Sequence, residues 1–172
     1  MIDGGRMMLE YRRLIEKVEG NMRHYRVLLN GLSRRRPSDL DTVFREATRE
    51  AFDEINCLQC ANCCVTTGPL LLERDIDRVA RSLRKRPAEL VEEMLHRDED
   101  GDWVFRTLPC PFLDEDNRCM IYSKRPKACR EYPHTDSRNV HQLFQKTLRN
   151  ALICPIVARV LQLIEYTYGG AK

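Results

Sequence analysis

The chain has 172 residues, of which 29 are Lys or Arg, 26 are Asp or Glu and 42% are hydrophobic. This length predicts one ordinary domain, and the eight Gly and eight Pro exclude collagen-like structure and overall disorder. A formal net charge of +3 is too small, in a chain that is 32% charged, to indicate nucleic-acid binding. The unusual feature is eight cysteines, which are clustered along the chain.

The N-terminal third predicts two helices. Apolar residues in the range 8–29 recur at spacings of three and four, which predicts an amphipathic helix that Gly20 weakens and Gly31 ends. Residues 33–37 are then expected to form a basic, solvated linker, and Ser38 to cap a second helix. The apolar face of this second helix would consist of Leu40, Val43, Phe44, Ala47, Ala51 and Ile55.

Further along the chain, helical and strand signals alternate. Residues 75–83 have helical spacing, and Pro87 suits the first turn of another helix whose inward face ends at Leu95. Residues 98–102 predict a turn that leads into a strand at residues 103–105.

The C-terminal part predicts a hairpin and more helix. Residues 114–117 are typical of a hairpin tip, residues 139–153 have helical periodicity, and Pro155 ends or kinks that helix. We therefore predict a mainly α protein, α+β at most. Its helices would pack around a loop-rich cysteine centre with a small β-hairpin.

The sequence also predicts a soluble, cytoplasmic protein. Residues 1–13 are charged and lack the apolar run of a secretory signal. The best apolar stretch, residues 151–157, is far shorter than the about 20 residues that span a bilayer, so no membrane partner is expected. In a reducing compartment, clustered cysteines favour metal binding or catalysis over disulfides.

The strongest motif is Cys57-x-x-Cys60-x-x-Cys63-Cys64. Three thiols in one loop with a fourth from elsewhere hold ferredoxin-type clusters, and a C-x-x-C pair also binds zinc when other thiols complete the site. The later cysteines are single, and they are Cys110, Cys119, Cys129 and Cys154. We predict that Cys57, Cys60 and one of Cys63 or Cys64 meet at least one of these later cysteines within metal-bridging reach. Cys154 lies on an apolar helical stretch, so from the pattern alone it fits a buried structural cysteine as well as a ligand.

Cys63 and Cys64 leave two alternatives open. Adjacent side chains in an extended segment point to opposite sides, so the two sulfurs would rarely bind one metal. Either one of them is a spare thiol, or they serve two neighbouring centres, for which eight thiols suffice. Nearby cations would either offset the charge of thiolates or form ordinary surface, and they are Arg118, Lys124, Arg125, Lys127 and Arg130.

The ordered motifs resemble the YkgJ-like cysteine-cluster family, described as zinc- or iron-chelating. The residues that carry the resemblance are Cys57-x-x-Cys60-x-x-Cys63-Cys64, Pro109-Cys110-Pro111-Phe112-Leu113, Cys119-Met120-Ile121-Tyr122 and Arg125-Pro126-x-x-Cys129-Arg130-x-Tyr132-Pro133. The resemblance runs to Cys154, which it implies is a ligand, so we predict that all eight cysteines are metal ligands. It divides the chain into an N-terminal helical extension, residues 1–56, and a cysteine-cluster domain, residues 57–172, expected to form one compact unit.

The resemblance implies metal chelation with a structural, redox or regulatory role. Its alternative is an iron–sulfur- or metal-dependent enzyme, because the flagellin lysine N-methylase of some bacteria has a similar cluster. No nucleotide loop, Ser/His/Asp pattern or H-E-x-x-H motif identifies catalytic residues, and whether the protein is an enzyme stays open. The partner is a metal ion or cluster, and a protein partner is left open. The in-loop spacing and the Cys154-Pro155 pair favour an iron–sulfur cluster over zinc.

We predict that order in the cysteine segments depends on the metal. Residues 57–68 and 109–133 contain few regular apolar patterns, so ligation would supply much of their order. Chelation, or Cys60→Ser, should expose these segments to limited proteolysis while the N-terminal helices stay protected. Equal protease resistance with and without metal would contradict this expectation.

Overall fold

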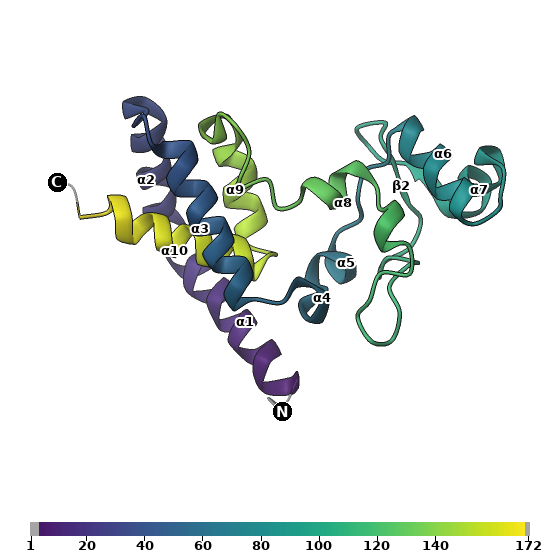
Figure 1. Cartoon of the computed structure of the whole chain (residues 1–172), viewed down its shortest axis with the longest axis horizontal. Coiled ribbons are helices and arrows are strands. Elements are labelled where there is room, and N and C mark those ends of the chain that lie inside the picture. The colour runs from purple at the N-terminus through teal and green to yellow at the C-terminus, as the bar shows by residue number, and fades with distance from the viewer. Residues whose placement is uncertain (1–3, 171–172) are drawn as a thin grey trace. The chain divides into compact units, whose positions relative to one another are not determined.

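Helices dominate the computed structural model, which describes residues 4–170 (Figure 1). The described chain forms two units. The first joins its two ends, up to Cys60 and from Pro133 onward, and the second is Ala61–Tyr132. The predicted mainly α class with one small hairpin is confirmed. The expected division at residue 57 follows the motif rather than the packing, and it stays a prediction.

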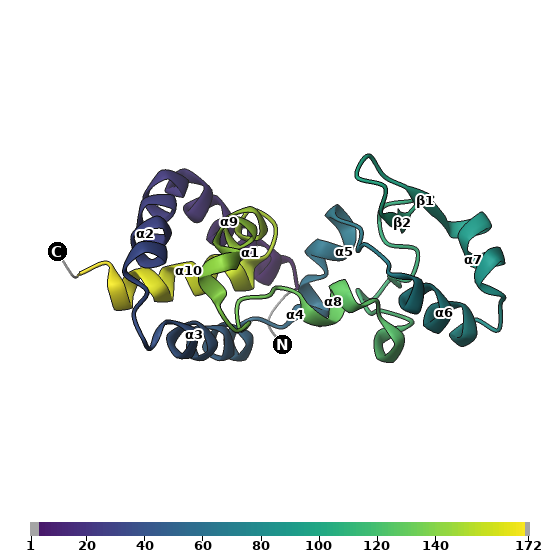
Figure 2. The ribbon, with the colours of Figure 1, turned by 90° about the horizontal axis from the view of Figure 1, so that it is seen from above.

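The first unit is a helical bundle organised around its last helix. Figure 2 shows α10 between α3 on one side and α1 and α9 on the other. Its elements are α1 (Gly4–Gly20), α2 (Met22–Arg35), α3 (Leu40–Glu54), α4 (Cys57–Cys60), the 3₁₀ helix η2 (Val140–Leu143), α9 (Phe144–Ala151) and α10 (Pro155–Tyr168).

Helix α10 is apolar on most of its surface because neighbours surround it. Its fully buried residues include Val157, Leu161 and Ile164. Two polar contacts fix it at the bundle's rim: Arg159 Nε donates to Glu54 at 2.7 Å, and the Tyr25 hydroxyl donates to Glu165 at 2.9 Å. Across the part of the chain that the structure describes, no helix is both long enough and apolar enough to cross a membrane.

The second unit packs two helices and a hairpin around a separate apolar core. Strands β1 and β2 pair antiparallel with Leu95 opposite Phe105, and the Leu71 N–H donates to the Trp103 carbonyl at 2.7 Å. Its elements are α5 (Asn62–Thr66), α6 (Glu73–Ser82), α7 (Pro87–Met94), β1 (Leu95–Arg97), β2 (Trp103–Phe105), the 3₁₀ helix η1 (Tyr122–Lys124) and α8 (Lys127–Glu131). The core is Leu71, Ile76, Val79, Ala80, Leu90, Leu95, Phe105, Phe112 and Ile121.

The predicted N-terminal helix is wrong in both its continuity and its end. The structure interrupts it at Asn21, whose side-chain amide donates to the Lys17 carbonyl at 2.8 Å and satisfies the end of α1. Helix α2 then continues through Gly31, where a glycine is tolerated, and ends at Arg35.

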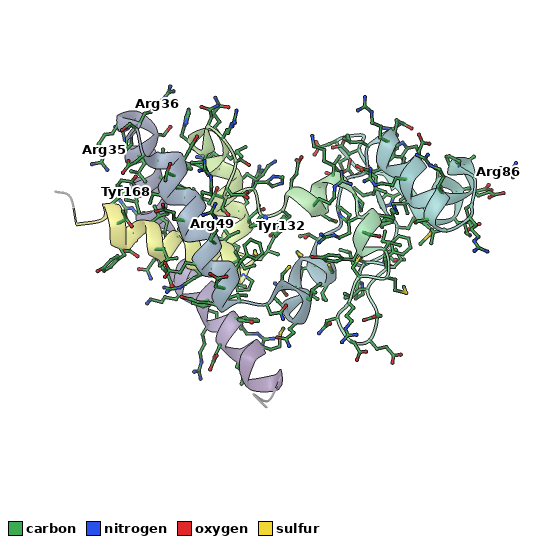
Figure 3. All side chains as sticks on the ribbon, viewed as in Figure 1. Arg35, Arg36, Arg49, Arg86, Tyr132 and Tyr168 are labelled. Carbon is green, nitrogen blue, oxygen red and sulfur yellow. The ribbon has the colours of Figure 1, made fainter. Side chains whose placement is uncertain are left out.

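The basic run is therefore the C-terminus of α2 rather than a linker. Arg34 and Arg35 lie in its last turn, where positive charge interacts favourably with the helix dipole. Figure 3 labels Arg35 at this end of the helix. Arg36 follows in the left-handed region, with φ of 45°, and its N–H donates to the Leu32 carbonyl at 2.8 Å.

Two other segments differ from the expected helices. Leu95 is buried as predicted but begins strand β1 rather than ending α7. The helix expected over residues 139–153 begins with a 3₁₀ turn and stops at Ala151. Pro87 opens α7, and Pro155 both interrupts the helical pattern and opens α10.

A core substitution tests the packing of the first unit. Leu29 of α2 is fully buried, so Leu29→Ala should lower the free energy of unfolding by about 2–5 kcal/mol, measured by urea denaturation. Leu9 of α1 is 55% exposed, and the same truncation there should cost far less. Equal losses would show that Leu29 is not part of a close-packed core.

Candidate metal centre

The first cysteine motif folds as two short helices with a left-handed residue between them. Cys57 and Cys60 begin and end α4, and the Asn56 side chain accepts the Leu58 N–H at 3.0 Å. Ala61 follows with φ of 46°, a value uncommon for a residue with a Cβ. Helix α5 begins at the next residue.

Cys63 and Cys64 lie on α5 and not on an extended segment. Neighbouring side chains on a helix point about 100° apart and not to opposite sides, and the Cys63 side chain forms a hydrogen bond with that of Cys64, so the expectation that the two sulfurs diverge is wrong. The Thr67 hydroxyl donates to the Cys63 carbonyl at 2.9 Å, and the Cys64 N–H donates to the Ala61 carbonyl at 2.8 Å. Both contacts close the short helix.

The second unit brings four thiols together, which we call the unit-2 thiol group. The group is Cys64, Cys110, Cys119 and Cys129. Cys110 is tied directly to the first motif, because its N–H donates to the Cys64 carbonyl at 2.8 Å. Cys119 lies across the predicted hairpin, in an antiparallel bridge with Leu113. Cys110 and Cys119 also pack against the apolar core, and Cys129 lies on α8.

The four thiols of this group act on one another electrostatically. Burial raises the pKa of Cys129 to about 12, and negative charge at Cys64, Cys110 and Cys119 acts in the same direction. Burial likewise raises the pKa of Cys110 and of Cys119. Without a metal, these three thiols stay protonated at neutral pH.

Cys64 is the exception in the group. A hydrogen bond from Cys63, assisted by the positive charge of Arg125, lowers the pKa of Cys64 to about 7 although burial opposes the shift. Vicinal Cys63 therefore interacts with Cys64 directly. Cys64 is accordingly the member of the group most easily converted to a thiolate.

Arg125 is the predicted cation that acts on the thiols. Its charge lowers the pKa of Cys64 and opposes the upward shifts at Cys119 and Cys129. The guanidinium lies over the Tyr122 ring at 3.5 Å from the centroid, and Nε donates to the Tyr122 carbonyl at 2.9 Å. No pattern in the sequence singles out Tyr122 for this role.

Backbone amides support three of the sulfurs. The Phe112 N–H bonds to the Cys110 sulfur and the Ile121 N–H to the Cys119 sulfur, in each case two residues along the chain. Both contacts favour the thiolate over the thiol. At Cys154, the amides at the start of α10 act in the same sense. Hydrogen bonds to sulfur are one of the means by which proteins tune bound metals.

The first unit holds three cysteines of its own. Cys57 is exposed, whereas Cys60 and Cys154 are buried. Burial raises the pKa of Cys154 to about 12, and negative charge at Cys57 and Cys60 acts in the same direction. Cys154 is therefore a neighbour of the C-x-x-C pair, although more than half of the chain's length separates them in sequence.

The interactions between cysteines lie within each unit, and the predicted shared site of Cys57, Cys60 and one of Cys63 or Cys64 stays a prediction. Cys64 meets three later cysteines, and the pair Cys57 and Cys60 meets Cys154. Within residues 4–170, which include every cysteine, no disulfide forms. Within the same residues, no three His, Cys, Asp or Glu side chains have the arrangement of a metal site. The sulfurs interact without converging on one point, and ligation would draw them together.

Comparison with known proteins identifies the cysteine-bearing segment. A family model named CxxCxxCC, described as "Putative zinc- or iron-chelating domain", matches residues 56–154. This range covers more than half of the chain and includes all eight cysteines. No curated protein and no solved structure gives a significant match.

Alkylation of the metal-free protein tests the order of thiol acidity. Iodoacetamide reacts with thiolates, so at pH 7 it should modify Cys64 before Cys129 and Cys154, as followed by peptide mass spectrometry. The rate at Cys64 should rise as the pH passes through about 7. Arg125→Gln should move this rise to higher pH, because it removes a positive charge that favours the thiolate.

The matched control is Arg118→Gln, which removes a charge from the same predicted set of cations. Its effect on the alkylation of Cys64 should be small. Equal rates at Cys64 and Cys129 in the wild-type protein would contradict the assigned environments.

Proposed function

The chain belongs to the CxxCxxCC family of zinc- or iron-chelating domains, and we propose that it binds metal through two sets of cysteines. The first set is the unit-2 thiol group, with four sulfurs. The second is Cys57, Cys60 and Cys154 in the first unit. The observation that carries the proposal is the mutual electrostatic influence of four thiols from three separate segments of the second unit.

The donor chemistry of the unit-2 thiol group suits either metal. Four thiolates satisfy tetrahedral zinc and also the four irons of a cubane cluster. Backbone amides already face two of the sulfurs, and Arg125 supplies positive charge that would offset the thiolates. A bound zinc ion would supply structural stability, whereas a cluster would also supply electron transfer.

We favour an iron–sulfur cluster over zinc because the sulfurs of each set come from separate segments of the chain. The C-x-x-C pair lies near Cys154, which precedes Pro155, and the amides of Ile156 and Val157 act on that sulfur. A cluster presents separate irons to separate thiolates, so scattered single cysteines can each reach one corner. Zinc instead requires all sulfurs at one point.

The proposal extends to a structural, redox or regulatory role in the cytoplasm, where thiols stay reduced. Metal binding must displace protons from Cys110, Cys119, Cys129 and Cys154, since burial raises the pKa of each thiol. Metal affinity should therefore fall as the pH falls. The lysine N-methylase-like enzyme stays a prediction from the resemblance alone.

Metal analysis of anaerobically purified protein tests the proposal. We expect stoichiometric iron with acid-labile sulfide and a brown colour. Cys119→Ser and Cys110→Ser remove ligands of the same set, so the double variant should lose no more metal than either single variant. Combining Cys119→Ser with Cys57→Ser should lose more, because the two residues belong to different sets.

Two results would contradict different parts of this proposal. Wild-type protein that contains neither zinc nor iron, and takes up neither, overturns metal binding. Stoichiometric zinc without labile sulfide, in protein kept from air throughout, overturns the preference for an iron–sulfur cluster and leaves metal binding intact.

A further inference from the structure

A buried carboxylate in the second unit links helix α6 to the segment that precedes Cys129. Asp75 is only 2% exposed. It accepts the Leu72 N–H at 3.1 Å, which caps α6, and the Lys127 N–H at 3.0 Å, which begins α8. It also pairs with the Arg78 guanidinium one turn along α6. One side chain thereby joins the starts of two helices that are distant in sequence.

Arg78 donates hydrogen bonds to the same segment that Asp75 contacts. Its Nη2 donates to the Arg125 carbonyl at 2.8 Å, and its Nε donates to the Lys124 carbonyl at 3.3 Å. The ion pair thus binds carbonyl groups and an amide of the same short segment, residues 124–127. A buried charge is stable only when hydrogen bonds and opposite charge compensate for its loss of water. For Asp75 and Arg78, residues 124–127 supply some of those hydrogen bonds.

Residues 124–127 determine the positions of one cation and one thiol of the unit-2 thiol group. Arg125 lies within this segment, and its guanidinium acts on three of the four thiols. Cys129 lies on α8, whose first N–H is the one that Asp75 accepts. Fixing the backbone of residues 124–127 therefore fixes where both the cation and the fourth thiol stand.

A second ion pair of the second unit shows that such a pair need not serve the thiols. Arg86 and Glu89 are also three residues apart and pair at 2.7 Å at the start of α7. The Arg86 side chain is 81% exposed and points outward (Figure 3). Among the described residues, the Arg86 guanidinium bonds to Glu89 alone. The two pairs match in spacing and chemistry and differ in what they hold.

We propose that Asp75 and Arg78 are positioning residues of the metal site, which hold residues 124–127 so that Cys129 and Arg125 face the other three thiols. This inference rests on the proposed metal binding by the unit-2 thiol group. Neither residue touches the metal; both act through the backbone between them and the ligand. Groups that orient metal ligands typically contribute about 10–100-fold to metal affinity.

Arg78→Lys tests the inference without removing charge. Lysine keeps the positive charge but cannot reproduce the planar fork that reaches two carbonyl oxygens and a carboxylate. With full-length, reduced, metal-free protein, Co²⁺ serves as the probe, because its thiolate charge-transfer and ligand-field bands report affinity and geometry. Arg78→Lys should weaken Co²⁺ binding about 10-fold or more, in competition with a chelator, and should alter the ligand-field bands.

Two further variants separate position from charge. Arg86→Lys, the matched control, should bind Co²⁺ as the wild-type protein does, with an unchanged spectrum. Arg125→Gln leaves the link itself in place, because Arg78 contacts the carbonyl oxygen of residue 125 and not its side chain. It should weaken binding while the ligand-field bands keep the wild-type shape. Thermal unfolding of each metal-free variant reports whether the fold is intact.

The outcomes distinguish this inference from the proposal on which it rests. Wild-type affinity and spectrum in Arg78→Lys overturn the positioning role and leave metal binding in place. A weaker affinity with an unchanged spectrum shows a purely structural or electrostatic effect and also overturns it. If wild-type protein shows no thiolate-to-cobalt band, metal binding by the unit-2 thiol group fails, and the inference fails with it.

Discussion

Burial of sulfur is the constraint on which the chemistry of this protein depends. A buried thiol keeps its proton, and burial raises the pKa of Cys110, Cys119, Cys129 and Cys154. A cation reverses that preference, and a bound metal ion supplies positive charge at the sulfur itself. Amide donors at Cys110, Cys119 and Cys154 favour the same thiolate state, as does the charge of Arg125 at Cys119 and Cys129. The fold therefore holds its cysteines in a state that a metal ion is suited to change.

The spacing of apolar residues predicts a helix correctly where that helix packs against the core along its whole length. The spacing of six apolar residues in the range 40–55 predicts α3, and five of them are buried while Val43 is half-buried. The break at Asn21 was missed because the apolar spacing continues across it, and periodicity alone does not record the capping contact with Lys17. Strand β1 was missed because three residues are too few to establish a period, and its pairing with β2 decides its conformation.

The cysteine site was predictable in its residues but not in its grouping. Motif spacing identifies seven of the cysteines and the family resemblance adds Cys154, and both leave Cys63 and Cys64 equivalent. What separates them is the hydrogen bond from the Cys110 N–H to the Cys64 carbonyl, a contact between distant segments that leaves no trace in either one. The left-handed conformation of Ala61 could not be predicted either, because Gly and Asn adopt this conformation readily and alanine does not.

Helix α6 shows how one element can serve both the core and the site of the second unit. Ile76, Val79 and Ala80 face the apolar core, while Asp75 and Arg78 reach the segment before α8. The same core contains Phe112 and Ile121, whose amides bond to the sulfurs of Cys110 and Cys119. Packing of α6 thus sets the position of residues 110–121, which carry Cys110 and Cys119, through apolar contacts. It sets the position of α8 through the ion pair. Because three of the four thiols are attached to those two elements, their arrangement is a property of the core as much as of the loops that carry them.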